Sequence, residues 1–167
     1  MYFIYKGDIM LSVHRLNLKH FVTSLAISLG TGILSGILTM GAMESFEKAV
    51  KPPLTPPSFL FPIVWFILFA LMGISAYIVY ESDSPYRKSA LTIYIIQLAV
   101  NFIWPLLFFN MQAYLFSFIW ILLLWVLIII MIAQFYKVSK PAALLQIPYL
   151  LWVTFAAYLN FGVYLLN

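Results

Sequence analysis

The sequence predicts an all-α integral membrane protein, a bundle of five transmembrane helices. Its 9 basic and 5 acidic side chains all lie outside four long apolar stretches, which are residues 21–43, 52–80, 89–136 and 141–167. A bilayer core requires about 20 apolar residues per spanning helix, and a charge at its centre costs roughly 2.5 kcal/mol or more. With 65% hydrophobic and 8% charged residues, the composition excludes the soluble domain classes.

The first predicted helix lies near 21–43 and follows a basic segment that contains Lys6, Arg15 and Lys19. A secretory signal also begins with basic residues, but its apolar core is usually only about 7–15 residues long. No small-x-small cleavage site follows this segment. We therefore expect it to be retained as a spanning helix.

Ser28, Gly32 and Gly36 recur every four residues along this first helix. Small residues at this spacing form a stripe that lets another helix backbone approach closely. Two interpretations stay open: the stripe joins two subunits of a homodimer, or it packs the first helix within its own bundle.

The longest linker, residues 44–58, has the sequence ESFEKAVKPPLTPPS. Its SFEKAV part is expected to form a helical turn or two at the membrane interface. The prolines that follow cannot continue a helix and favour extended polyproline geometry. Two alternatives stay open for it: a stiff surface linker, or a lid over a cavity, since linkers this long are uncommon unless they have a role.

The stretch 89–136 is too long for one span, and Asn110, Met111 and Gln112 near its middle predict a turn. The remaining helices are expected near 59–80, 89–109, 114–136 and 142–165. No internal repeat is visible, so residues 1–167 are expected to form a single domain.

The positive-inside rule predicts that the N-terminus is cytoplasmic. One side of the predicted topology carries Lys6, Arg15, Lys19, Arg87, Lys88, Lys137 and Lys140, whereas the other carries Lys48 and Lys51. These charges are scattered among the linkers rather than gathered in a stripe, so no nucleic-acid partner is expected. The absence of an organelle-targeting presequence and of cysteine favours a bacterial plasma membrane.

Ionisable and metal-binding residues are absent from the predicted spans. There is no cysteine, and His14 and His20 both precede the first span, where they are expected to be solvated. We expect no metal site, because a third ligand is missing. Ion-driven transport and acid–base hydrolysis within the membrane are not expected either.

Amides and large rings share one face of the third predicted helix, which carries Tyr94, Gln97, Asn101, Trp104 and Phe108 at three- and four-residue spacing. Lipid would leave the amides unsatisfied, so this face is expected to meet protein or a cavity.

Similar stripes occur on two other helices. They are Trp65, Phe69, Met72 and Ala76 on the second, and Tyr149, Trp152, Ala156 and Asn160 on the fifth, just after Pro148. The three faces predict an apolar slot with a few polar anchors, the usual form of a small-molecule site. The alternative is that the amides only tie helices together, at about 0.6 kcal/mol per contact, and that the rings fill the core.

Three segments of the chain resemble the TspO/MBR family of tryptophan-rich sensory and translocator proteins. They are KPPLTPPSFLFPIVWFILFALMGISAY (51–77), QLAVNFIWPLLFF (97–109) and PYLLWVTFAAYLN (148–160). The resemblance implies a five-helix bundle, often dimeric, with a hydrophobic pocket beneath the loop between the first two helices. It also implies binding of porphyrins.

The resemblance assigns roles to individual residues. Trp65 and Trp152 correspond to the pocket tryptophans, Asn101 and Trp104 to a wall, and Ala156 to the floor. With the stripes and loop prolines, the expected ligand-binding residues are Pro56, Pro57, Trp65, Phe69, Gln97, Asn101, Trp104, Tyr149, Trp152 and Ala156.

The expected function is that of a membrane receptor or sensor for tetrapyrroles such as protoporphyrin IX, with the porphyrin as ligand and no cofactor required. Haem fits less well, because no span offers a His or Cys axial ligand. Three alternatives stay open: light-dependent tetrapyrrole degradation in which Trp65 and Trp152 take part, transport of a porphyrin or another amphiphile, and a bundle without a ligand.

The sequence departs from the family pattern at several positions. Leu54, Phe59 and Phe102 stand where many relatives have tryptophan. The C-terminus lacks the Lys or Arg that a sterol-recognition pattern requires after Tyr164, which argues against specific sterol binding.

Overall fold

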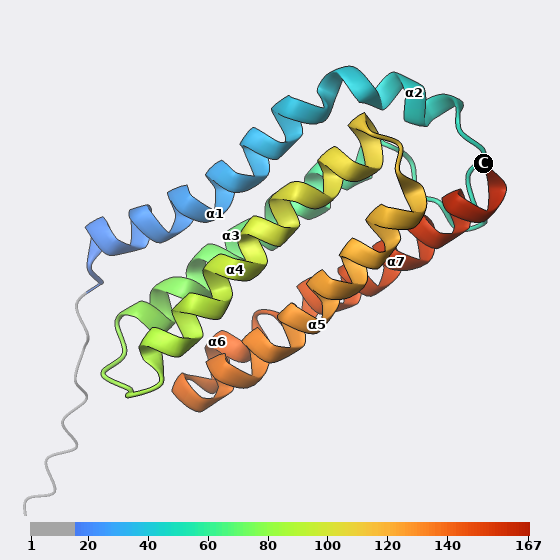
Figure 1. Cartoon of the computed structure of the whole chain (residues 1–167). Coiled ribbons are helices and arrows are strands. Elements are labelled where there is room, and N and C mark those ends of the chain that lie inside the picture. The colour runs from blue at the N-terminus through green and yellow to red at the C-terminus, as the bar shows by residue number, and fades with distance from the viewer. Residues whose placement is uncertain (1–15) are drawn as a thin grey trace, which may run out of the picture.

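The computed structural model describes residues 16–167, and every regular element within them is a helix (Figure 1). The elements are α1 (Leu18–Thr39), a 3-10 turn (Met40–Ala42), α2 (Met43–Lys48), α3 (Leu60–Tyr80), α4 (Arg87–Pro105), a π-helical turn (Leu106–Asn110), α5 (Tyr114–Val138), α6 (Lys140–Leu144) and α7 (Ile147–Leu166). Within residues 16–167, five segments are long and apolar enough to cross a membrane, which confirms the predicted fold class.

The helices form an elongated bundle in which α4 lies between α1 and α5 (Figure 1). The helix α1 packs on α3 and α4, α5 packs on α4 and α7, and α6 lies against α3 and α5. The short helix α2 and the C-terminus lie at one end, and the start of α1 and α6 lie at the other (Figure 1). The helix at the start of the 44–58 linker confirms the helical turn predicted there.

Charged side chains occupy the two ends of the bundle. Lys48 and Lys51 lie at the α2 end, whereas Lys19, Arg87, Lys88, Lys137 and Lys140 lie in or next to the terminal turns at the other end. Lys6 and Arg15 fall outside the described residues. The cytoplasmic position of the N-terminus and the bacterial plasma membrane stay predictions.

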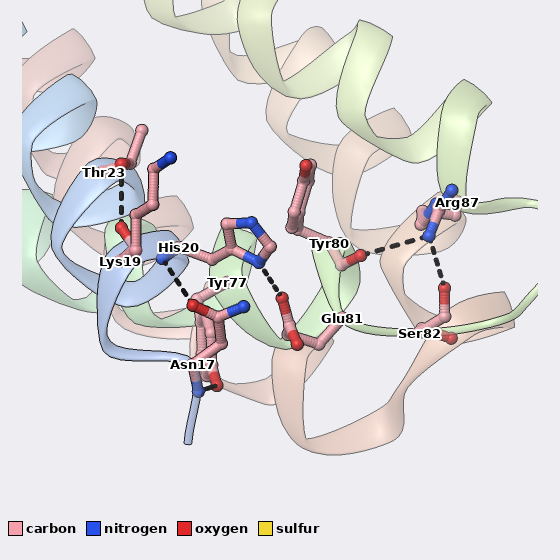
Figure 2. Close-up of polar contacts among 9 residues, drawn as sticks. All are labelled: Asn17, Lys19, His20, Thr23, Tyr77, Tyr80, Glu81, Ser82 and Arg87. Atoms are coloured by element: carbon pink, nitrogen blue, oxygen red, sulfur yellow. Dashed lines mark hydrogen bonds and ion pairs between the residues drawn. The ribbon is translucent and has the colours of Figure 1, made fainter. Parts of the chain in front are cut away.

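A polar cluster joins the first turn of α1 to the last turn of α3 (Figure 2). The Asn17 side chain caps α1 by accepting a hydrogen bond from the His20 backbone N–H at 3.3 Å. The Asn17 N–H donates to the Tyr77 hydroxyl at 3.1 Å, and His20 Nδ1 lies 2.6 Å from Glu81 Oε1. His20 is partly exposed, as predicted, and it is also paired with the Glu81 carboxylate. His14 lies outside the described residues.

The predicted small-residue stripe packs α1 on α3 within the same chain. The Ser28 hydroxyl donates a hydrogen bond to the Phe69 carbonyl, and a Cβ on Gly32 would lie 2.4 Å from the Phe69 ring. Gly36, by contrast, is exposed, and a Cβ there would meet nothing within 4 Å. A homodimer contact through this stripe stays a prediction, with Gly36 as its exposed member.

A π-helical turn ends the third span, where the sequence analysis expected one continuous helix over 89–109. Pro105 has no N–H to donate to the Asn101 carbonyl, so the α-helical hydrogen-bond pattern cannot pass through it. The chain continues with wider turns, and the Met111 N–H donates to the Leu106 carbonyl at 3.0 Å. Phe108 and Phe109 are thereby placed beside the rings of α4.

The fifth span is also interrupted, because α6 and α7 are separate helices rather than one helix over 142–165. Pro148 in the first turn of α7 cannot donate to the carbonyl one turn earlier, and the break falls at Gln146. The Ser75 hydroxyl donates to the Ala142 carbonyl at 2.6 Å and holds α6 against α3.

Candidate functional site

An aromatic cluster lies between α3, α4 and α7. The Trp65 ring centroid lies 5.7 Å from Phe69, 6.3 Å from Trp104 and 6.3 Å from Tyr149. The backbones of α3 and α7 make little contact, so these rings bridge the interval between them. The structure thus brings together residues from all three stripes that the sequence analysis identified.

Trp152 lies at the edge of this cluster. Its ring packs against Phe61 at 5.9 Å and Phe155 at 5.7 Å. Its Nε1 is buried and has no hydrogen-bond partner among residues 16–167. Trp65 and Trp152 are both half-buried, whereas Trp104 is buried. The cluster therefore combines partly accessible indole rings with one unused hydrogen-bond donor.

Asn101 and Gln97, predicted as polar anchors for a ligand, bond within the protein. The Asn101 Nδ2 donates to the Tyr149 hydroxyl at 2.5 Å, which donates to Gln97 Oε1 at 2.9 Å. The Gln97 Nε2 lies 3.8 Å from the Met72 sulfur. These buried contacts link α3, α4 and α7, as the helix-tying alternative expects.

Asn160 makes a second buried network. Its Oδ1 accepts hydrogen bonds from Trp104 Nε1 at 3.1 Å and from the Ser117 hydroxyl at 3.0 Å. Its Nδ2 donates to the Tyr114 carbonyl at 2.9 Å. Because Trp104 Nε1 is engaged, only the ring of this residue is available to a ligand. Ala156 is 5% exposed and lies on the same buried face of α7, one turn from Asn160.

The loop after α2 is fastened to the outer half of α7. The Tyr158 hydroxyl donates to the Pro53 carbonyl at 3.0 Å, and a Cβ on Gly162 would lie 2.5 Å from Pro52 Cβ. These contacts attach the loop to α7, and its action as a lid stays a prediction. Pro56 is half-buried and Pro57 is exposed, so the prolines that contact α7 are the other pair.

A third fastening lies at the C-terminus, where the Asn167 side chain bonds both the N–H and the carbonyl of Val50 at 3.0 Å. The sequence analysis did not identify Tyr158, Gly162 or Asn167. Gly162 could have been found, because a glycine within an apolar spanning helix often marks a close approach of another segment.

No candidate metal-binding site is present in the part of the chain that the structure describes. It contains no group of three or more His, Cys, Asp or Glu side chains able to hold an ion. The cluster's chemistry is that of aromatic stacking, apolar contact and a single indole N–H.

Comparison with known proteins matches residues 23–166 to the TspO/MBR family. The Tryptophan-rich protein TspO of Chlorobaculum tepidum is 43% identical over 126 residues, which cover 73% of this chain and 78% of that protein. The protein of the same name from Archaeoglobus fulgidus is 36% identical over 153 residues, covering 91% and 99%. The human Translocator protein is 31% identical over 144 residues, covering 84% and 85%. These matches confirm the resemblance, and the chain is an integral membrane protein that belongs to the TspO/MBR family.

Proposed function

We propose that this protein is a receptor or sensor that binds protoporphyrin-type tetrapyrroles between α3, α4 and α7, beneath the loop that follows α2. The observation that carries the proposal is Trp152, a half-buried indole whose buried Nε1 has no partner among residues 16–167. An unpaired buried donor is costly, and a ligand acceptor would relieve that cost.

A porphyrin suits the chemistry of this cluster. Planar macrocycles stack on aromatic rings, and each such contact contributes about 0.5–1.5 kcal/mol beyond burial. Trp65 and Trp152 are the partly accessible rings on which it would stack. Access requires the rings that bridge α3 and α7 to separate, together with release of the loop.

The loop end of the cluster also offers a positive charge for the porphyrin's propionates. The Lys51 ammonium lies 5.1 Å from the Phe46 ring centroid and 3.3 Å from the Glu47 carbonyl. Phe46 contacts Phe108 at 5.4 Å, and Phe108 stacks on Trp104 at 5.5 Å. The cation and the aromatic cluster are therefore connected through two rings.

A titration with protoporphyrin IX in detergent, in darkness, tests this proposal through the porphyrin's Soret absorbance. Wild type is expected to bind saturably. Trp152→Phe is expected to bind about fivefold more weakly, because it loses one hydrogen bond worth about 1 kcal/mol and keeps an aromatic ring. Trp125→Phe is the control, since its Nε1 already bonds Thr154 at 2.8 Å. Binding that does not saturate would contradict the proposal.

Two further measurements separate this proposal from its alternatives. Light-dependent loss of bound porphyrin in wild type, absent from Trp65→Phe/Trp152→Phe, would indicate a degrading enzyme. Saturable flux of labelled porphyrin into proteoliposomes would indicate a transporter. The receptor proposal expects binding without either.

A further inference from the structure

An open groove of about 570 Å³ runs between α4 and α5 on the outer face of the bundle, away from the aromatic cluster. It begins at the end of the bundle where α4 starts and α5 finishes. Its lining residues are Pro85, Lys88, Ser89, Thr92, Ile93, Ile96, Ile130 and Gln134.

The lining of this groove changes from polar to apolar along the helix axis. Lys88 and Ser89 lie in the first turn of α4, and Ile93 and Ile96 follow one and two turns deeper. At a rise of about 1.5 Å per residue, Lys88 and Ile96 are separated by about 12 Å along the axis. This order matches that of a phospholipid, whose charged headgroup lies above its apolar chain.

Positive charge gathers at the mouth of the groove. The Lys88 side chain is exposed, and its ammonium has no hydrogen bond or ion pair within residues 16–167; its backbone carbonyl accepts a hydrogen bond from the Thr92 hydroxyl at 2.9 Å. Arg87, in contrast, donates to the backbone carbonyls of Tyr80 at 3.4 Å and Ser82 at 3.3 Å (Figure 2). Lys137 lies 5.7 Å from the Tyr86 ring centroid.

The acidic residues nearest in sequence form no ion pair with Lys88 in the part of the chain that the structure describes. Glu81 is paired with His20, and Asp83 lies exposed in the linker before α4. The first turn of α4 contains no acidic residue, so the positive end of its helix dipole adds to the charge of Lys88.

A half-buried amide lies at an intermediate depth. Gln134, in the penultimate turn of α5, makes no side-chain hydrogen bond within the described residues, and it lines the groove four residues from Ile130. Lipid-facing amides are costly unless they are satisfied. Ester carbonyls of a phospholipid are acceptors at this depth.

We propose that the groove between α4 and α5 binds one phospholipid with an anionic headgroup. Lys88 holds the phosphate, Ser89 and Gln134 bond the glycerol ester region, and an acyl chain lies along Ile93 and Ile96. A free phosphate ion would leave the apolar part of the groove empty, whereas a lipid fills it with an acyl chain. The site is separate from the porphyrin site, so either proposal can fail alone.

Native mass spectrometry of the full chain, titrated with palmitoyl-oleoyl phosphatidylglycerol or phosphatidylcholine, tests the headgroup. We expect one phosphatidylglycerol to bind in preference to phosphatidylcholine. Lys88→Gln is expected to weaken phosphatidylglycerol binding about fivefold, the effect of about one lysine at an anionic surface. Lys140→Gln, an exposed lysine at the same end that lies near Tyr136, is the control and is expected to change nothing.

A second pair of variants tests the chain part of the groove. Ile96→Trp fills the groove and is expected to reduce phosphatidylglycerol binding, whereas Ile95→Trp, on an exposed neighbouring position outside the groove, is expected to leave it unchanged. Equal losses in Lys88→Gln and Lys140→Gln would overturn the proposal. So would displacement of the lipid by inorganic phosphate, or a dimer that forms in place of the lipid adduct.

Discussion

Replacement of Tyr149 by Phe tests whether the buried hydrogen bonds between α4 and α7 stabilise the bundle. Tyr149 is 1% exposed, and its hydroxyl both accepts from Asn101 at 2.5 Å and donates to Gln97 at 2.9 Å. Tyr149→Phe keeps the ring that packs against Trp65 and removes only the hydroxyl. It leaves two buried amide groups without this partner.

The magnitude follows from the two bonds that are lost. Hydrogen bonds between membrane helices contribute about 0.6 kcal/mol on average and about 1.7 kcal/mol at most. Two of them give about 1.2 kcal/mol, which lowers the folding equilibrium constant about eightfold. If the amides stay unsatisfied in the variant, the loss approaches about 3 kcal/mol.

Reversible unfolding in mixed micelles, titrated with dodecyl sulfate, measures this free energy. Tyr164→Phe is the matched control on the same helix, because Tyr164 is 38% exposed and its hydroxyl makes no hydrogen bond within residues 16–167. A double-mutant cycle of Tyr149→Phe with Gln97→Leu should give a coupling near 0.6 kcal/mol, the value of the shared bond. Equal unfolding free energies for Tyr149→Phe and Tyr164→Phe would refute the reasoning.

Three other substitutions test the loop, the α1–α3 contact and the ligand site. Gly162→Ala places a Cβ 2.5 Å from Pro52, so amide hydrogen exchange in residues 49–58 should become faster while the bundle stays folded. Gly32→Ala places a Cβ 2.4 Å from Phe69 and should lower the free energy of unfolding by about 1–3 kcal/mol in the micelle titration. Trp152→Phe should weaken porphyrin binding but change the unfolding free energy of the ligand-free protein little, because the loss of a costly unpaired donor offsets the loss of ring packing.

Matched controls are available on α1. A Cβ on Gly30 or Gly36 would meet nothing within 4 Å. Gly30→Ala and Gly36→Ala should therefore stabilise the helix by about 0.5–1 kcal/mol instead of destabilising it. Destabilisation by Gly30→Ala as large as that by Gly32→Ala would show that the Phe69 contact is not the cause. Unchanged exchange in residues 49–58 of Gly162→Ala would contradict the role assigned to Pro52.

The positions of the five spans were predictable from the sequence, because a charged side chain is costly in the bilayer core and therefore marks residues outside a span. The predicted 59–80 and the observed Leu60–Tyr80 differ by one residue at the start. The sequence analysis expected continuous helices over 89–109 and 142–165, and it missed the π-helical turn after Pro105 and the break before Pro148. Pro105 and Pro148 each remove one backbone hydrogen bond, which is evident from the sequence. Whether a wider turn or a break forms there depends on how the neighbouring helices pack.

The candidate site was predictable only at the level of helix faces. Spacing placed Gln97, Asn101 and Trp104 on one stripe of α4, and the structure confirms that this stripe faces protein. The sequence alone did not distinguish an amide that awaits a ligand from one that bonds another helix. That distinction depends on Tyr149, about fifty positions away, whose hydroxyl lies between the two amides only after α4 and α7 have packed.

The sequence by itself determined the membrane environment, the number of spans and the faces on which rings and amides lie, because these follow from local hydrophobicity and helical periodicity. Only the tertiary structure decided the partners: Gly32 against Phe69, Gly162 against Pro52, and Trp152 Nε1 without a partner. Contacts between distant segments depend on the distance and angle at which helices pack, and a single helix does not encode these quantities.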